Sequence, residues 1–250
     1  MVLKKTLFMT KLNQTRTIHI YVPDSYTYTN KRYPVLYMFD GHNLFFDQEA
    51  TYGKSWNLMQ HIQEENRELI VVGQECSHEG NNRLDEYGPY PFADAYFGTF
   101  EGKGDLTMDF FVHELKPYMD TNFPTISDRE HTWIGGSSCG GLMAYYALCA
   151  YNSIYSKALV ISPYVQVVED YLYWQTEHTD FHYDTSVYIS WGAMEYGKHH
   201  FFQETKICTN LVNQLIQKGV YAQMNVKLDG EHTERSWEEE VPTFLSFLFQ

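Results

Sequence analysis

The sequence predicts an α/β fold in which a mostly parallel central sheet carries helices on both faces. Short β-rich apolar runs alternate along the chain with segments of helical periodicity, an order typical of parallel sheets. Two runs, residues 33–40 (YPVLYMFD) and 68–75 (ELIVVGQE), have continuous apolar centres, as strands buried on both faces do. The chain has 250 residues and no repeat or linker-like segment, so we expect a single domain over residues 1–250.

The strands are predicted from short apolar runs. Residues 15–23 alternate in polarity and form a half-buried strand that Pro23 ends. Further strands are expected at 33–40, 68–75, 131–136, 157–162, 186–192 and 221–228. The segments 76–104 and 163–185 are too long and irregular to be simple connections. We expect the aromatic-rich segment 163–185 to form a cap over the functional site.

The helices are predicted from apolar residues at helical spacing, over 108–123, 142–151, 201–219 and 236–249. Pro117 is expected to kink or end the first of them, and Gly219 to close the third. Ser236 with Glu239 fits a capping box at the start of the last helix. Pro242 fits the interior of that helix poorly, which favours a later start.

The amino-acid composition limits the classes of molecule that the protein is expected to bind. Lys and Arg number 18 against 32 Asp and Glu, a formal charge of −14 that repels phosphate backbones and anionic lipid. We therefore expect neither nucleic acid nor a membrane as partner, and no apolar stretch approaches the roughly 18 residues of a membrane helix. The amino-terminal stretch MVLKKTLFMTKLNQ lacks the apolar run of an export signal. Four scattered cysteines without CxxC spacing indicate reduced thiols and a cytoplasmic protein.

A glycine-rich turn between a predicted strand and helix carries the candidate nucleophile. Residues 136–140, GSSCG, fit the pattern Gly-x-Ser-x-Gly. The central residue of such a turn has strained backbone geometry, and only small residues fit two positions before and after it. A turn centred on Ser137 would place Cys139 at a flank, and one centred on Cys139 departs from the pattern. Ser138 is therefore the preferred nucleophile.

A serine hydroxyl needs a base, and the base needs an acid that orients it. His232 follows the last predicted strand in KLDGEHTERSW, where this architecture places the base. The acid is expected after the strand that precedes the last one, which points to Glu195 in YISWGAMEYG. Asp170, after the strand at 157–162, is the rival acid.

An oxyanion hole requires two backbone N–H donors. The N–H of Cys139, which follows the nucleophile, is the first expected donor. The second is the N–H of His42, in the loop GHNLFF after residues 33–40. Gly41 is expected to give this loop the freedom to turn.

The chain resembles the putative-esterase branch of the α/β-hydrolases, which includes feruloyl esterases, siderophore esterases, S-formylglutathione hydrolases and mycolyltransferases. The resemblance covers most of the chain through the segments VLYMFDGHNLF, NNRLDEY, GGSSCGGLMAYYAL, SWGAMEYG and GEHTERSWEEEVPTFLSFL. It implies an α/β-hydrolase fold, with Ser138 as nucleophile, Glu195 as acid and His232 as base. Two positions depart from the family pattern: many relatives have Met or Leu at Cys139, and the position of His42 varies.

These observations predict a serine carboxylic-ester hydrolase that forms an acyl-enzyme and acts on a small-molecule or carbohydrate-linked ester. Arg83 and Tyr87 are expected to line the pocket, although Arg83 fits a structural ion pair equally well. No metal or organic cofactor is expected, because the sequence has no histidine pair with ligand spacing on one helix and no phosphate loop. An acyltransferase using the same site and a non-catalytic binding module with this fold are the alternatives.

Overall fold

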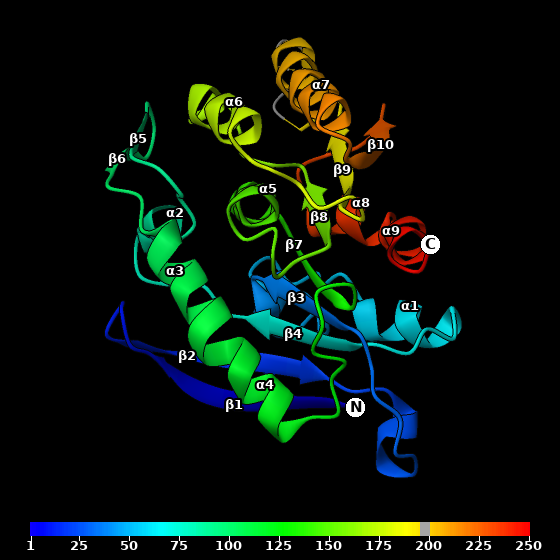
Figure 1. The fold of residues 1–250 in the computed structure, drawn as a ribbon. Coiled ribbons are helices and arrows are strands. Elements are labelled where there is room, and N and C mark those ends of the chain that lie inside the picture. Colours follow the sequence, from blue (N-terminus) through cyan, green and yellow to red (C-terminus); the bar gives the residue numbers. More distant parts are fainter. Residues whose placement is uncertain (196–200) are drawn as a thin grey trace.

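An eight-stranded sheet forms the centre of the computed structural model, which describes residues 1–195 and 201–250 (Figure 1). Within these residues the strand order is β1-β2-β4-β3-β7-β8-β9-β10. The strands are β1 Val2–Met9, β2 Gln14–Tyr21, β3 Val35–Phe39, β4 Ile70–Gln74, β7 Thr132–Ser137, β8 Lys157–Ile161, β9 Ser186–Gly192 and β10 Tyr221–Lys227. All pairings from β4 to β10 are parallel, so the predicted mostly parallel sheet is confirmed. The end of the motif SWGAMEYG, at positions 196 and 197, lies outside the described residues.

One edge of the sheet is antiparallel. β2, the strand expected at 15–23, pairs antiparallel with β4 and with β1. The sequence pattern does not predict β1, because half of its residues are exposed and the adjacent Lys4 and Lys5 interrupt the alternation of polar and apolar residues. Lysines of this kind are typical of edge strands, where they discourage pairing with another chain.

Helices cover both faces of the sheet (Figure 1). One face carries the helices from α3 to α7, and the other carries α1, α8 and α9. The helices are α1 Leu58–Glu64, α2 Asn82–Glu86, α3 Gly104–Phe110, α4 Lys116–Asn122, α5 Cys139–Ala150, α6 Glu169–Glu177, α7 Phe201–Gln217, α8 Glu234–Glu238 and α9 Val241–Leu248. A hairpin of β5 Phe92–Asp94 and β6 Gly98–Phe100 stands apart from the main sheet. None of the helices in the described ranges is long and apolar enough to cross a membrane.

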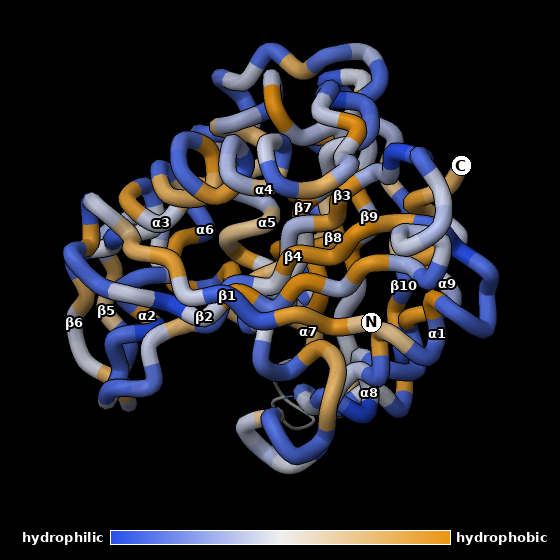
Figure 2. The backbone as a smooth tube through the Cα atoms, turned by 90° about the horizontal axis from the view of Figure 1, so that it is seen from below, coloured by the Kyte–Doolittle hydropathy of each residue, from blue (hydrophilic) through white to orange (hydrophobic). Residues whose placement is uncertain are grey.

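The sheet separates two hydrophobic cores. Along β3, Tyr37 and Phe39 enter the core beneath α3 to α7, whereas Leu36 and Met38 enter the core beneath α1 and α9. This alternation follows from the pleat, which directs successive side chains to opposite faces. The central strands are accordingly apolar, and the polar segments lie in the outer loops (Figure 2). The rigid central strands thus hold the loops at their ends in place.

The two prolines expected to disturb helices do so in different ways. Pro117 is the second residue of α4, and a π-helical segment, Phe111–Leu115, joins α4 to α3. Proline has no N–H to donate and its ring clashes with the carbonyl four residues before it, and the departure from α-helical hydrogen bonding occurs over the residues just before Pro117. Pro242 is the second residue of α9, so the later start expected there is confirmed.

The capping box predicted at Ser236 is wrong. The preceding helix α8 begins at Glu234 and is capped by Thr233, whose side chain accepts a hydrogen bond from the Ser236 N–H at 3.4 Å. The hydroxyl of Ser236 instead accepts a hydrogen bond from the N–H of Glu231 at 2.9 Å. The serine therefore holds the loop before α8, which carries His232.

Candidate active site

A pocket of about 940 Å³ lies at the carboxyl ends of the parallel strands, within the size range of small-molecule sites. We call it the Ser138 pocket; its wall includes Asp40, His42, Cys76, Arg83, Ser138 and His232. The pocket lies beside β3 and β7, which are neighbours although the chain passes from β3 to β4 on the other side. Parallel sheets bind ligands at such a switch point, because the loops diverge there and leave a crevice.

Ser138 lies at a sharp turn between β7 and α5. Its backbone has φ 57° and ψ −123°, a region that residues other than glycine rarely adopt. A Cβ atom on Gly136 would lie 2.7 Å from the carbonyl carbon of Gly140, so the turn closes only with glycine at this flank. The residue with the strained backbone is Ser138, as a Gly-x-Ser-x-Gly turn centred on Ser138 requires. Ser137 is the last residue of β7 and Cys139 is the first of α5.

The neighbouring thiol is a poor nucleophile. Cys139 is buried, and burial raises the pKa of its thiol above the usual value, although the Arg83 charge opposes the shift. A protonated thiol reacts slowly, because the thiolate is the nucleophile. The environment therefore favours the Ser138 hydroxyl over the Cys139 thiol.

Glu195 and His232 form a hydrogen-bonded pair. Oε2 of Glu195 lies 3.0 Å from Nδ1 of His232, and the Glu195 side chain is 2% exposed while that of His232 is 23% exposed. The other oxygen of Glu195, Oε1, accepts hydrogen bonds from the Ser162 hydroxyl at 2.6 Å and the Gly192 N–H at 2.5 Å. The carboxylate is thus fixed on one side, and its second oxygen faces the histidine.

The loops after β9 and β10 bring this pair together. A Cβ atom on Gly192 would lie 2.2 Å from the carbonyl oxygen of Gly230, so the loops make backbone contact that only glycine permits. The N–H of Met194 donates to that same carbonyl oxygen at 2.9 Å. Glu195 is the third residue after Gly192 and His232 is the second after Gly230, so glycines at the strand ends place the pair.

Asp170, the rival acid, lies in the first turn of α6 and is exposed. Its segment, 163–185, contributes no described residue to the Ser138 pocket. It forms α6 instead, where the Thr176 hydroxyl lies 2.6 Å from the Tyr145 hydroxyl of α5. The segment adds to a helical layer through α6, and its expected role as a cap stays a prediction.

The loop after β3 brings the His42 backbone to the pocket. Asp40 takes the left-handed conformation, with φ 56°, and Gly41 begins a 3₁₀ helix. The turn therefore depends on Asp40, and the expected role of Gly41 is corrected. Glycine is required at position 41 because a Cβ there would lie 2.3 Å from the Gly73 carbonyl oxygen. Among described residues, the N–H groups of His42 and Cys139 donate no hydrogen bond.

Arg83 holds the Asp40 loop through a bidentate ion pair. Its Nε and Nη2 donate to Oδ1 and Oδ2 of Asp40 at 2.8 and 2.6 Å. Burial alone would raise the pKa of Asp40, but the Arg83 charge and hydrogen bonds hold it below its usual value. Arg83 lines the pocket, whereas Tyr87 is fully buried behind it. The Tyr87 hydroxyl donates to Gln74 at 2.6 Å, so the expected contact of Tyr87 with the pocket is not made.

Sequence reasoning missed several residues of this site. The Ser162 hydroxyl accepts a hydrogen bond from Trp237 Nε1 at 2.9 Å, and the Trp237 ring meets that of His232 edge-on at 5.1 Å. Glu234, also in the pocket wall, has a carboxyl whose pKa burial raises above its usual value. Ser162 follows β8, and Glu234 and Trp237 follow β10. Residues after parallel strands gather at one edge of the sheet, and this position is the sequence feature that could have identified them.

The family described as Putative esterase matches residues 9–248. The chain belongs to this putative esterase family. A curated relative, the uncharacterized protein YbbA of Bacillus subtilis, is 29% identical over 59% of this chain and 56% of its own length. The chain thus spans little more than half of this relative.

Solved structures show the fold of this putative esterase in other proteins. An IroE-like serine hydrolase from Shewanella oneidensis has a TM-score of 0.78 at 18% identity, covering 98% of this chain and 80% of that one. A ferulic acid esterase has a TM-score of 0.72 at 19% identity, covering 99% of this chain and 97% of that one. These likenesses confirm the α/β-hydrolase fold.

Proposed function

We propose that this putative esterase is a serine carboxylic-ester hydrolase with the triad Ser138, His232 and Glu195. The observation that carries the proposal is that one pocket is lined both by the strained Ser138 turn and by His232, whose ring is hydrogen-bonded to the buried Glu195. Strained backbone at a pocket is a mark of functional sites. A carboxylate on Nδ1 fixes the tautomer of the histidine in which Nε2 accepts the serine proton.

The reaction follows from these positions. The Ser138 hydroxyl attacks the ester carbonyl while His232 takes its proton, and Glu195 stabilises the imidazolium that forms. The backbone N–H groups of Cys139 and His42 stabilise the negative oxygen of the tetrahedral intermediate. His232 then protonates the departing alcohol, which leaves an acyl-enzyme. Water, activated by the same histidine, releases the acid and restores the serine.

The substrate class is a small-molecule ester. The pocket volume of about 940 Å³ accommodates an ester with a compact acyl group, since small-molecule pockets span about 300–1,000 Å³. The pocket wall contains Arg83, His42 and Glu234, groups that suit polar or phenolic substituents. The fold shared with a ferulic acid esterase makes aromatic acid esters the first candidates.

An ester panel tests this function. p-Nitrophenyl esters of increasing acyl length and esters of aromatic acids are supplied to the wild type, Ser138→Ala and Ser137→Ala. We expect Ser138→Ala to lower kcat by up to about 10⁶, as loss of a triad serine does, with a far smaller effect of Ser137→Ala. A sugar alcohol is also added to the assay. Accumulation of its acyl ester in place of the free acid would favour the acyltransferase alternative. No hydrolysis of any ester by the wild type would contradict the proposal.

A further inference from the structure

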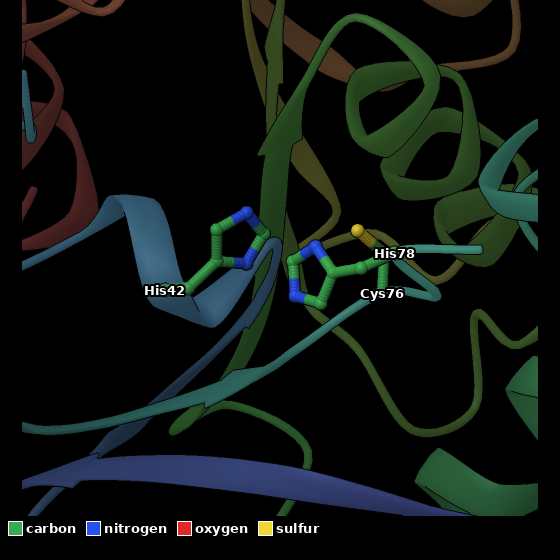
Figure 3. A group of neighbouring side chains, drawn as sticks. All are labelled: His42, Cys76 and His78. Atoms are coloured by element: carbon green, nitrogen blue, oxygen red, sulfur yellow. The ribbon is translucent and has the colours of Figure 1, made fainter. Parts of the chain in front are cut away.

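We propose that His42, Cys76 and His78 form a Zn²⁺ site in the wall of the Ser138 pocket. Their side chains approach one another from the loops that follow β3 and β4 (Figure 3). The candidate ligand atoms all lie within 4.8 Å of one another. β3 and β4 are parallel neighbours, so the sheet brings together residues whose spacing matches no metal-binding motif.

His42 already has the arrangement of a metal ligand. It is 5% exposed, and its Nε2 lies 2.9 Å from the Thr51 hydroxyl. Its Nδ1 is buried without a hydrogen-bond partner among described residues, which is costly for a polar atom. A histidine that ligates metal with one nitrogen usually holds a polar partner with the other. A cation bound at Nδ1 would satisfy the unpartnered atom.

His78 and Cys76 supply the other two donors. The His78 ring meets that of His42 edge-on, with centroids 4.7 Å apart. Nε2 of His78 lies 3.8 Å from Oε2 of Glu75, beyond hydrogen-bond distance, so either ring nitrogen of His78 can serve as the donor. Cys76 is buried, and its thiol proton is lost to solvent when the metal–sulfur bond forms.

The donor set favours zinc. One thiolate and two imidazoles suit Zn²⁺, whereas Mg²⁺ and Ca²⁺ prefer oxygen ligands. Tetrahedral Zn–N and Zn–S bonds would place the ligand atoms about 3.5 Å apart. The ligand atoms lie within 4.8 Å of one another, so binding requires each pair to approach by at most about 1.3 Å. The His78 side chain is 58% exposed and can make this movement. Three protein ligands leave the fourth position of the ion open.

Zinc in this place would inhibit ester hydrolysis, an inference that rests on the proposed function. The same loop residue, His42, supplies the proposed oxyanion N–H and one zinc ligand. A bound ion would occupy the part of the Ser138 pocket that the ester carbonyl must enter. It would also hold the His42 loop in the geometry that the metal requires. We therefore expect Zn²⁺ to act as a reversible inhibitor.

Calorimetric titration of the metal-free protein with Zn²⁺ tests the site directly. We expect one strong site per chain, and Cys76→Ser and His78→Ala should each weaken Zn²⁺ binding at least about tenfold. His113→Ala removes an exposed histidine outside the cluster and should leave the affinity unchanged. Co²⁺ should give a thiolate charge-transfer band in the wild type and none in Cys76→Ser. Unchanged affinity in both cluster variants would overturn the site.

Ester hydrolysis is then measured against Zn²⁺ concentration, each protein being compared with its own metal-free rate. We expect inhibition of the wild type that a chelator reverses, and no inhibition by Mg²⁺. The half-inhibiting concentration should rise in Cys76→Ser by the factor found in calorimetry. Binding without inhibition would overturn the inhibitory role. If the metal-free protein hydrolysed no ester, the proposed function would fail, and the titration would still decide the metal site.

Discussion

Replacing Glu195 with glutamine removes one charge and keeps the shape of the side chain. The carboxylate lies 3.0 Å from Nδ1 of His232, which places the charge centres about 4 Å apart when the imidazolium forms. At an effective dielectric constant of about 20, two unit charges at this distance attract by about 4 kcal/mol. Each 1.36 kcal/mol is about a factor of ten in rate, so kcat should fall about 10³-fold.

A second effect adds to this loss. A glutamine amide that donates toward Nδ1 favours the tautomer with its proton on Nε2, where it cannot act as base for Ser138. Amide replacement of a triad carboxylate lowers kcat by about 10⁴, so we expect Glu195→Gln to fall between about 10³ and 10⁴. The KM should change little, because Glu195 lies behind His232 and outside the pocket wall.

The assay is steady-state hydrolysis of the best p-nitrophenyl ester, with urea unfolding to verify that the variant is folded. Asp170→Asn is the matched control, since Asp170 is exposed on α6 and should leave kcat unchanged. A loss of less than tenfold in folded Glu195→Gln would refute the electrostatic reasoning. A large loss in Asp170→Asn would assign the acid to the earlier strand.

Three further variants test the Cys139 thiol, the Arg83–Asp40 ion pair and the buried carboxyl of Glu204. Cys139→Ala should retain kcat within about fivefold, because only the backbone N–H is assigned a role; steady-state hydrolysis measures it, and a loss near that of Ser138→Ala would assign chemistry to the thiol. Arg83→Ala leaves the buried Asp40 charge unpaired and should lower the free energy of unfolding in urea by about 3 kcal/mol; an unchanged value would show that the pair does not hold the loop. Burial, with a smaller contribution from Glu195, raises the pKa of Glu204 to about 8 from 4.5, so wild-type stability should fall as pH rises through that window. Glu204→Gln should remove the fall, with a gain over wild type of at most about 5 kcal/mol near pH 9; parallel stability curves would contradict it.

The turn that holds Ser138 could be predicted from the sequence, because its geometry depends on residues close together in the chain. Gly136 and Gly140 approach each other so closely that side chains are excluded, and this constraint is visible as the spacing of two glycines. The same holds for the central strands, whose burial on both faces requires continuous apolar residues. Local steric constraints and burial leave direct traces in the chain, so these features could be predicted.

Other features depend on contacts between distant segments. The left-handed Asp40 is stabilised by Arg83, which comes from α2, and no local pattern links the two positions. Tyr87 was expected to line the pocket, yet it is fully buried. The segment 163–185 forms a helix whose packing partners, α5 and α7, lie elsewhere in the chain. Such arrangements follow from tertiary packing, which single-sequence periodicity does not encode.

The central claim is that Ser138 is the residue that reacts with the ester carbonyl. Organophosphonates form a stable bond with an activated serine, so the wild-type protein is treated with a fluorophosphonate and its peptides are mapped by mass spectrometry. The turn geometry of Ser138 and the Glu195–His232 pair predict a single modification on Ser138. A label on Ser137 or Cys139, with Ser138 unmodified, would contradict the account.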